Sequence, residues 1–317
     1  MASSDGRLDS GERAARAAWV FPGQGSQQVG MGQDVLQASP AARRLFLDAD
    51  SLLGRPLSEI CFQGPEDLLR QTENAQPAIM VVSLACLAAA EERGILSSLM
   101  PLYMAGHSLG EYTAAVAANA LSFEDGLRLV QERGRLMKLA AEENPGAMAA
   151  ILGLDEQQAA ALCRETGAEV CNLNAPGQIV IGGVLEAVET AMERARSYGA
   201  RRAVRLNVSG AFHTSLMGPA VAGMSTAVSE VEIRGPSVPV VANGSAEPLT
   251  TAGALREELL YQLTHPVQWQ QSVELMVDGG VSAFVELGPG EVLCGLIRRI
   301  APAVTTLSVN SVDSLAQ

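Results

Sequence analysis

Lysine and histidine are scarce in this 317-residue sequence. Lys138 is the only lysine among 22 basic side chains, so Schiff-base chemistry and a phosphate-loop lysine have almost no candidate. The three histidines, His107, His213 and His265, are too few and too isolated for a histidine-rich metal centre. We therefore expect no metal, and a histidine here is better suited to acid–base chemistry.

Paired cysteines and excess positive charge are also missing. The five cysteines are scattered, and no two of them have the spacing of a zinc or redox motif. This pattern predicts reduced thiols in a cytoplasmic protein. The formal net charge is −13, which argues against general binding to nucleic acid or to an anionic membrane.

The sequence has no apolar run long enough to span a membrane. The run over residues 78–90 falls short of the roughly 20 residues that a bilayer requires, so it predicts a buried helix. Gln76 and Pro77 are expected to open that helix, because proline is tolerated in a first turn. Residues 1–17 are polar and lack the apolar segment of a signal peptide. We expect a disordered tail there.

What the sequence does contain is a regular alternation of short apolar runs and amphipathic stretches, which predicts an α/β fold with a largely parallel sheet. The pattern of predicted elements changes over residues 146–208, where strands and helices follow in the order βαββαβ, which is typical of a ferredoxin-like unit. We therefore predict a large catalytic domain over 18–145 and 209–317 and an inserted small domain over 146–208. Late strands of the large domain are expected at VPVVAN (238–243) and AFVEL (283–287).

The motif GHSLG (106–110) matches G-x-S-x-G between a predicted strand and a predicted helix. In that setting the glycines allow a sharp turn, the nucleophile elbow of α/β-hydrolase-like folds, which exposes the serine hydroxyl. Ser108 is the predicted nucleophile. The amide of the next residue, Leu109, is placed to donate to an oxyanion.

A serine nucleophile needs a base, and His213 is the best of the three histidines. It follows the last strand of the inserted unit, whereas His107 adjoins Ser108 on a sharp turn and His265 precedes a proline. An ordinary hydrolase also has an acid between serine and histidine in chain order. The acids in that interval have no distinctive setting.

Arg133 lies in the middle of the apolar arc of a predicted helix over 126–137. A buried arginine is costly unless it meets an anion. Either a distant carboxylate of the protein satisfies it, or the anion is a carboxylate of the substrate, which a guanidinium binds with two hydrogen bonds.

Together these motifs resemble malonyl-CoA:acyl carrier protein transacylases. The resemblance covers nearly everything after residue 18, in the family's order. It is carried by FPGQGSQ (21–27), QPA (76–78), GHSLGE (106–111), ERGRLM (132–137), NAPGQIVIGG (174–183), SGAFHTSLM (209–217), QLTHPVQW (262–269) and ELGPG (286–290).

The resemblance implies a role for each matching residue. Ser108 would be the nucleophile, His213 its base and Arg133 the binding group for the malonyl carboxylate. The backbone amides of Gln24 and Leu109 would form the oxyanion hole. The backbone carbonyl of Gln262 would orient His213 in place of an acid. Gln76 and Asn174 also match family positions near the site and receive no firm role.

The reaction implied is transfer of a malonyl group from malonyl-CoA to the phosphopantetheine thiol of acyl carrier protein, in fatty-acid or polyketide synthesis. It needs no cofactor, and we expect a cytoplasmic monomer. The alternatives are a serine esterase or thioesterase on the same elbow and a non-catalytic module that docks carrier protein. The first leaves Arg133 unexplained, and the second leaves Ser108 and His213 unexplained.

Two further predictions concern specificity. In polyketide members of the family, phenylalanine directly before the histidine accompanies malonyl rather than methylmalonyl selection, so Phe212 predicts a malonyl enzyme. Acyl carrier proteins of this family's pathways are acidic, so docking on an acidic enzyme requires a local basic patch. The predicted patch consists of Arg194, Arg196, Arg201, Arg202 and Arg205.

Overall fold

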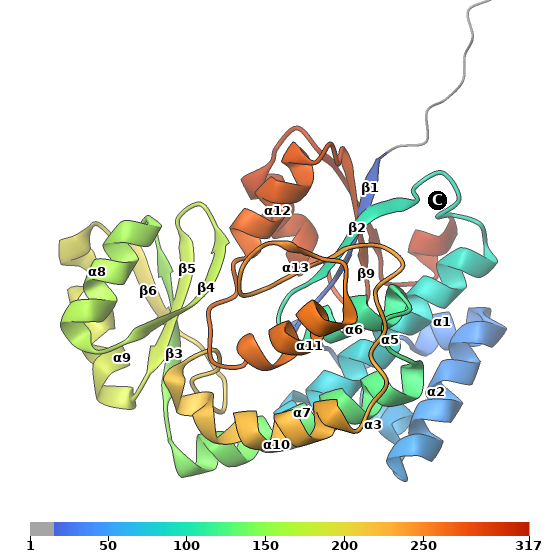
Figure 1. The fold of residues 1–317 in the computed structure, drawn as a ribbon, viewed down its shortest axis with the longest axis horizontal. Helices are drawn as coiled ribbons and strands as arrows, with labels where there is room; N and C mark the ends of the chain where they lie inside the picture. The colour runs from blue at the N-terminus through green and yellow to red at the C-terminus, as the bar shows by residue number, and fades with distance from the viewer. Residues whose placement is uncertain (1–15, 317) are drawn as a thin grey trace, which may run out of the picture.

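The computed structural model describes residues 16–316 and contains two separate β-sheets (Figure 1). The strands are β1 (Ala17–Phe21), β2 (Pro101–Gly106), β3 (Ala147–Leu152), β4 (Glu169–Ala175), β5 (Gln178–Gly183), β6 (Arg202–Arg205), β7 (Val240–Val241), β8 (Pro248–Leu249), β9 (Ala283–Leu287) and β10 (Thr305–Val309).

Helices of very different length connect these strands. The α-helices are α1 (Gln33–Ala38), α2 (Pro40–Leu53), α3 (Leu57–Gln63), α4 (Glu66–Arg70), α5 (Thr72–Glu92), α6 (Leu109–Ala117), α7 (Phe123–Glu143), α8 (Glu156–Thr166), α9 (Leu185–Arg194), α10 (Gly218–Ser229), α11 (Ala252–Tyr261), α12 (Trp269–Asp278) and α13 (Val292–Ile300). Short 3₁₀ helices are η1 (Ala195–Tyr198), η2 (Ser215–Met217) and η3 (Asp313–Ala316).

The larger sheet has six strands in the order β10-β9-β1-β2-β7-β8, and every pair except β7–β8 is parallel. Both faces of this sheet are buried. Side chains alternate between the two faces along a strand, so neighbouring residues of β1 report on opposite faces. On β1, Trp19 and Phe21 belong to the same core cluster as residues of α5, α6 and α7, whereas Ala18 and Val20 belong to a second cluster with residues of α12 and α13. The prediction of a largely parallel α/β sheet is confirmed.

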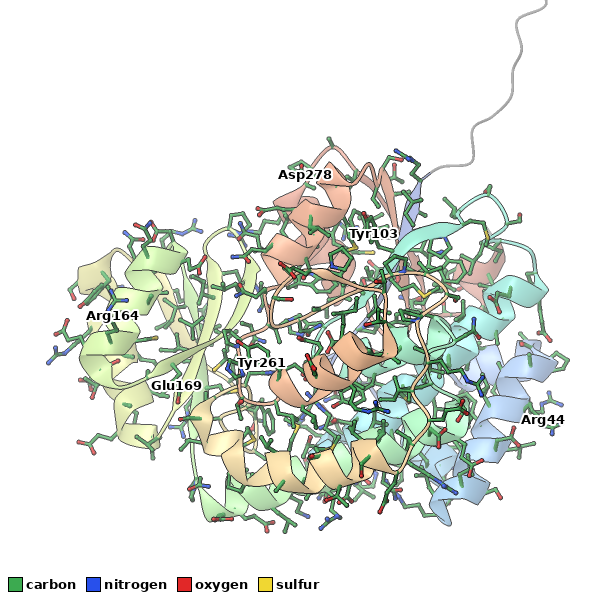
Figure 2. All side chains as sticks on the ribbon, in the orientation of Figure 1. Arg44, Tyr103, Arg164, Glu169, Tyr261 and Asp278 are labelled. Atoms are coloured by element: carbon green, nitrogen blue, oxygen red, sulfur yellow. The ribbon has the colours of Figure 1, made fainter. Side chains whose placement is uncertain are left out.

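The smaller sheet has four antiparallel strands in the order β4-β5-β3-β6, and it carries α8 and α9. This order, with the chain sequence βαββαβ, is the predicted ferredoxin-like arrangement. We call β3 to β6 (residues 147–205) the small-sheet region and the rest of the described chain the large-sheet region. Arg164 and Glu169 lie on the small-sheet region, and Arg44 lies at the opposite end of the molecule (Figure 2).

The buried helix α5 corrects one prediction. It begins at Thr72, so Pro77 lies inside the helix and not in its first turn. An interior proline leaves the carbonyl four residues earlier without its helical donor. Here that carbonyl, on Glu73, accepts a hydrogen bond from the Arg55 guanidinium at 3.1 Å. By length and composition α5 could cross a membrane, but nearly all of it is buried in the protein core.

Two predicted boundaries also differ from the structure. Residues 1–15 of the predicted tail lie outside the described residues, and its last residue, Ala17, is the first of β1. The strand expected over 238–243 is reduced to Val240–Val241, because Ala242 donates its N–H to Glu247 in a turn. Asn243 therefore stands at the end of β7, beside the end of β2.

Candidate active site

Ser108 stands between β2 and α6 in a strained turn, with φ 53° and ψ −106°. Non-glycine residues rarely adopt such a positive φ. The two flanking glycines are required by close packing. A Cβ on Gly106 would lie 1.9 Å from Gly110, and one on Gly110 would lie 2.1 Å from the carbonyl oxygen of Phe21. The backbone N–H of Ser108 donates to Asn243 Oδ1 at 2.6 Å.

The structure brings Ser108 and His213 together across 105 residues of sequence. Ser108 Oγ lies 2.7 Å from His213 Nε2, and His213 Nδ1 lies 2.7 Å from the backbone oxygen of Gln262. Because a carbonyl only accepts, Nδ1 carries the proton and Nε2 is left free to accept from the serine hydroxyl. This is the arrangement that the sequence predicts, with a carbonyl where an ordinary triad has an acid.

His213 is almost completely buried. Burial, followed by the positive charge of Arg133, lowers the pKa of His213 to about 3. A lowered pKa keeps the imidazole neutral at physiological pH, because the charged form is lost once the pH exceeds the pKa. The ring is therefore in the form that a general base requires.

Arg133 points inward from α7 and is only 1% exposed. Its guanidinium donates to Gln76 Oε1 at 2.7 Å, to Gln262 Oε1 at 2.7 Å and to Ser108 Oγ at 3.1 Å. Within residues 16–316 no carboxylate forms an ion pair with it, and its Nε has no partner. Neutral amides thus hold this buried cation beside the nucleophile, where an anion would be bound.

Gln24 and Leu109 line the same cavity of about 350 Å³ as Ser108, Arg133 and His213. The N–H of Leu109 is at the first position of α6, where no intrahelical acceptor exists. The glycine-rich turn that carries Gln24 packs directly on the elbow, since a Cβ on Gly23 would lie 2.4 Å from the carbonyl oxygen of His107. The oxyanion-hole assignment stays a prediction.

Phe212 also lines this cavity and is 7% exposed. Small-sheet residues Met148 and Asn172 line it too, so the cavity lies between the two regions. His107 lines the cavity as well, and its Nε2 lies 2.8 Å from Asn174 Oδ1. His265 stacks on Tyr261 instead, with ring centroids 3.5 Å apart.

Two of the five arginines in the predicted basic patch are paired with acidic side chains. Arg194 forms an ion pair with Glu165, and Arg205 forms one with Glu189 at 3.3 Å. The other three arginines, Arg196, Arg201 and Arg202, line one hollow on the outside of the small-sheet region. Acidic residues from α8 and α9 thus neutralise part of a patch that contains no acidic residue in its own segment.

Sequence reasoning missed several polar residues of the site. Asn243 holds the Ser108 amide, and Glu111 and Glu258 are buried behind the Ser108 turn. Gln76, which the family resemblance placed near the site without a role, accepts a hydrogen bond from Arg133. One usable signal existed for Asn243, which ends a predicted strand at the edge of the sheet where the elbow was expected. For Glu111 the usable signal is a charged residue in an otherwise apolar helix.

Comparison with known proteins identifies the family. The model of the acyl transferase domain matches residues 18–309. The malonyl CoA-acyl carrier protein transacylase of Bacillus subtilis (strain 168) is 42% identical over 306 residues, 95% of each chain. That of Escherichia coli (strain K12) is 41% identical over 94% of this chain and 97% of its own.

Solved structures agree with the sequence comparison. The acyl-carrier-protein S-malonyltransferase from Bartonella henselae superposes with a TM-score of 0.91 at 41% identity, over 95% of this chain and 97% of that one. A malonyl-transacylase in complex with its type II polyketide synthase acyl carrier protein gives 0.91 at 40% identity, over 95% and 98%. The chain belongs to the acyl transferase family, in its malonyl-CoA:acyl carrier protein transacylase branch.

Proposed function

We propose that this protein transfers a malonyl group from malonyl-CoA to the phosphopantetheine thiol of an acyl carrier protein. One observation carries the proposal: a hydrogen-bonded serine–histidine pair shares its cavity with a buried guanidinium that has no ion pair in the described chain, 3.1 Å from the serine oxygen. The site thus holds a nucleophile, a base and a binding group for a carboxylate. The names of the relatives point to the same substrate and acceptor.

In the first half-reaction Ser108 Oγ attacks the thioester carbonyl while its proton passes to His213 Nε2. The amides of Gln24 and Leu109 stabilise the oxyanion of the tetrahedral intermediate. The carbon–sulfur bond then breaks, and the CoA sulfur takes the proton from His213. The product is malonyl-Ser108 and free CoA.

The second half-reaction moves the malonyl group from Ser108 to the carrier protein. His213 takes the proton of the phosphopantetheine thiol, and the sulfur attacks the malonyl-serine ester. The ester bond breaks, and Ser108 recovers its proton from His213. Both half-reactions exchange one acyl–heteroatom bond for another, so we propose that no metal or redox cofactor takes part.

Arg133 supplies the selectivity in this proposal. The malonyl carboxylate would accept hydrogen bonds from a guanidinium that is otherwise held by amide oxygens. Acetyl-CoA would leave the buried guanidinium without a carboxylate as direct partner. All groups named here come from one chain, so the proposed reaction needs no second copy, and we propose a monomer. The five buried free cysteines are compatible with the cytoplasm, where we place the reaction.

A labelling experiment tests the proposed function. The protein is incubated with malonyl-CoA radiolabelled in the malonyl group, and bound label is measured before and after addition of phosphopantetheinylated carrier protein. We expect a labelled protein adduct, and movement of the label to carrier protein when it is added. Release of free malonate at the same rate with and without carrier protein would instead identify an esterase or thioesterase.

A further inference from the structure

Two buried carboxyl groups stand behind the nucleophile and have no part in the mechanism above. Glu111 on α6 is fully buried, and Glu258 on α11 is 6% exposed. Glutamate is seldom found so deep unless it is paired, because burying a charge is costly. Yet neither residue forms an ion pair within residues 16–316.

Glu111 accepts three hydrogen bonds, all from groups that can donate. Its Oε1 accepts from the backbone N–H of Asn243 at 2.7 Å and from Asn243 Nδ2 at 3.0 Å. Its Oε2 accepts from Gln262 Nε2 at 2.7 Å. An ionised carboxylate is acceptor-only, so these partners suit the charged form of Glu111.

Gln262 links Glu111 to the reacting groups. Its Nε2 also donates to the backbone oxygen of Ser108 at 3.1 Å, while its Oε1 accepts from Arg133 and its backbone oxygen accepts from His213. The side-chain amide of a glutamine can be flipped by about 180°, and its hydrogen-bond partners determine where the oxygen and the NH₂ group lie. With a carboxylate on one side, the NH₂ must face Glu111, and the oxygen is left to face Arg133.

We propose that Glu111 is a positioning residue for the carboxylate-binding arginine. Its carboxylate fixes the orientation of the Gln262 amide and provides the buried negative charge that balances the Arg133 guanidinium through that amide. Arg133 is thereby held beside Ser108 before the substrate arrives. The inference rests on the proposed function, because it assigns a support to the group that selects malonyl-CoA.

The surroundings of Glu111 predict a pH dependence. Burial and the negative charge of Glu258 raise the pKa of Glu111, and the hydrogen bonds from Gln262 and Asn243 oppose that rise. The other charged or titratable groups near it are Arg133 on α7 and Tyr112 on α6. A carboxyl with a raised pKa loses its charge as the pH falls through that pKa. Malonyl selection should therefore weaken in acid.

The test measures kcat/KM for malonyl-CoA and for acetyl-CoA and takes their ratio. Both reactions use Ser108 and His213, so the titration of the base cancels in the ratio. The substrate carboxyl, with an ordinary pKa of about 4, stays ionised above about pH 5. In Glu111→Gln the side-chain oxygen can still accept from Asn243, but an NH₂ then faces Gln262. We expect the ratio to fall roughly 10- to 100-fold, as for a lost hydrogen bond to a charged group, and to become independent of pH.

Two other buried glutamates provide matched controls. Glu258→Gln removes a carboxyl group from the same cluster without changing a side-chain contact of Gln262, because the Glu258 side chain accepts from the N–H of Gly244. Glu286→Gln alters a buried carboxyl on β9 that accepts from the N–H groups of Leu293 and Cys294. Both controls should keep the ratio at neutral pH near that of the wild type. The acidic fall should persist in both, at lower pH in Glu258→Gln, because the negative charge of Glu258 no longer raises the pKa of Glu111.

Each outcome has a definite meaning. An unchanged ratio in Glu111→Gln, or an equal fall in Glu258→Gln, overturns the inference. If Glu111→Gln does not fold, Glu111→Asp decides, because its shorter carboxylate should loosen the contact with Gln262 and lower the ratio. An unchanged ratio in Glu111→Asp overturns the inference. If the wild type shows no preference for malonyl-CoA at any pH, the proposed role of Arg133 fails, and with it the inference.

Discussion

The two sheet regions differ in what they bury. Almost every buried polar or charged side chain of the described chain lies in the large-sheet region, and Asn172 is the only such residue of the small-sheet region. The core of the small-sheet region consists of side chains such as Ile151, Leu162, Ile181 and Val188. Its described ion pairs, Arg194–Glu165 and Arg205–Glu189, are exposed.

This contrast indicates that the reacting groups lie in the large-sheet region and that the small-sheet region supports them. Buried polar groups are costly unless they are hydrogen-bonded, and those of the large-sheet region include the residues around Ser108. The large-sheet region holds the strained Ser108 and the network that surrounds it. The small-sheet region contributes Met148 and Asn172 to the cavity wall and a basic surface outside.

The strongest test removes the nucleophile of the large-sheet region. Ser108→Ala should lower malonyl transfer by roughly 10⁴-fold or more, the scale seen when a serine nucleophile is removed. The fold should survive, because a hydroxyl is replaced by hydrogen. Intact mass spectrometry after incubation with malonyl-CoA checks this. A stable malonyl adduct on the alanine variant would contradict the assignment.

The second test removes the cation of the same region. Arg133→Ala should lower kcat/KM for malonyl-CoA by roughly 100-fold, because two or more charge-assisted hydrogen bonds are lost. Transfer from acetyl-CoA should fall far less or even rise. Arg128→Ala, on the exposed side of α7 where Arg128 pairs with Glu124, is the matched control. Equal losses for both acyl groups would show that Arg133 is structural.

The third test concerns the cavity wall beside the base. The wild type should prefer malonyl-CoA to methylmalonyl-CoA in kcat/KM, because Phe212 limits the space for a substituent. Phe212→Ser should narrow the preference by roughly 1 to 3 kcal/mol, the value of one methyl group in a pocket. A wild-type preference for methylmalonyl-CoA would refute this prediction.

The smallest expected effect lies on the small-sheet region. Reversing both Arg201 and Arg202 to Glu should raise KM for carrier protein about fivefold at low salt, since exposed charge pairs contribute up to about 1 kcal/mol each. Added salt should reduce the difference, and acylation by malonyl-CoA should stay unchanged. The control reverses the exposed Arg43 and Arg44 of α2. Arg44 lies at the far end of the molecule (Figure 2). An unaltered KM at low salt would exclude the patch as a docking surface.

Local sequence patterns predicted the parts of this fold that depend on neighbouring residues. The short apolar run AFVEL predicted β9, and the order βαββαβ predicted the small sheet. The error at Pro77 has a long-range cause. The carbonyl that this proline leaves free is satisfied by Arg55, a residue far from it in sequence. The rule that proline occurs in the first turn of a helix considers only neighbouring residues, so it could not predict this contact.

The sequence by itself determined the elbow, because the strained turn at Ser108 requires glycine on both sides, and it determined that Arg133 points inward, because helical spacing is local. Only the tertiary structure decided which groups meet these residues. Ser108 bonds Asn243 across 135 residues, Gln262 bonds Glu111 across 151, and Glu165 and Glu189 neutralise two arginines of the predicted patch. Hydrogen bonds and ion pairs depend on distance in space, and the packing of distant segments sets that distance.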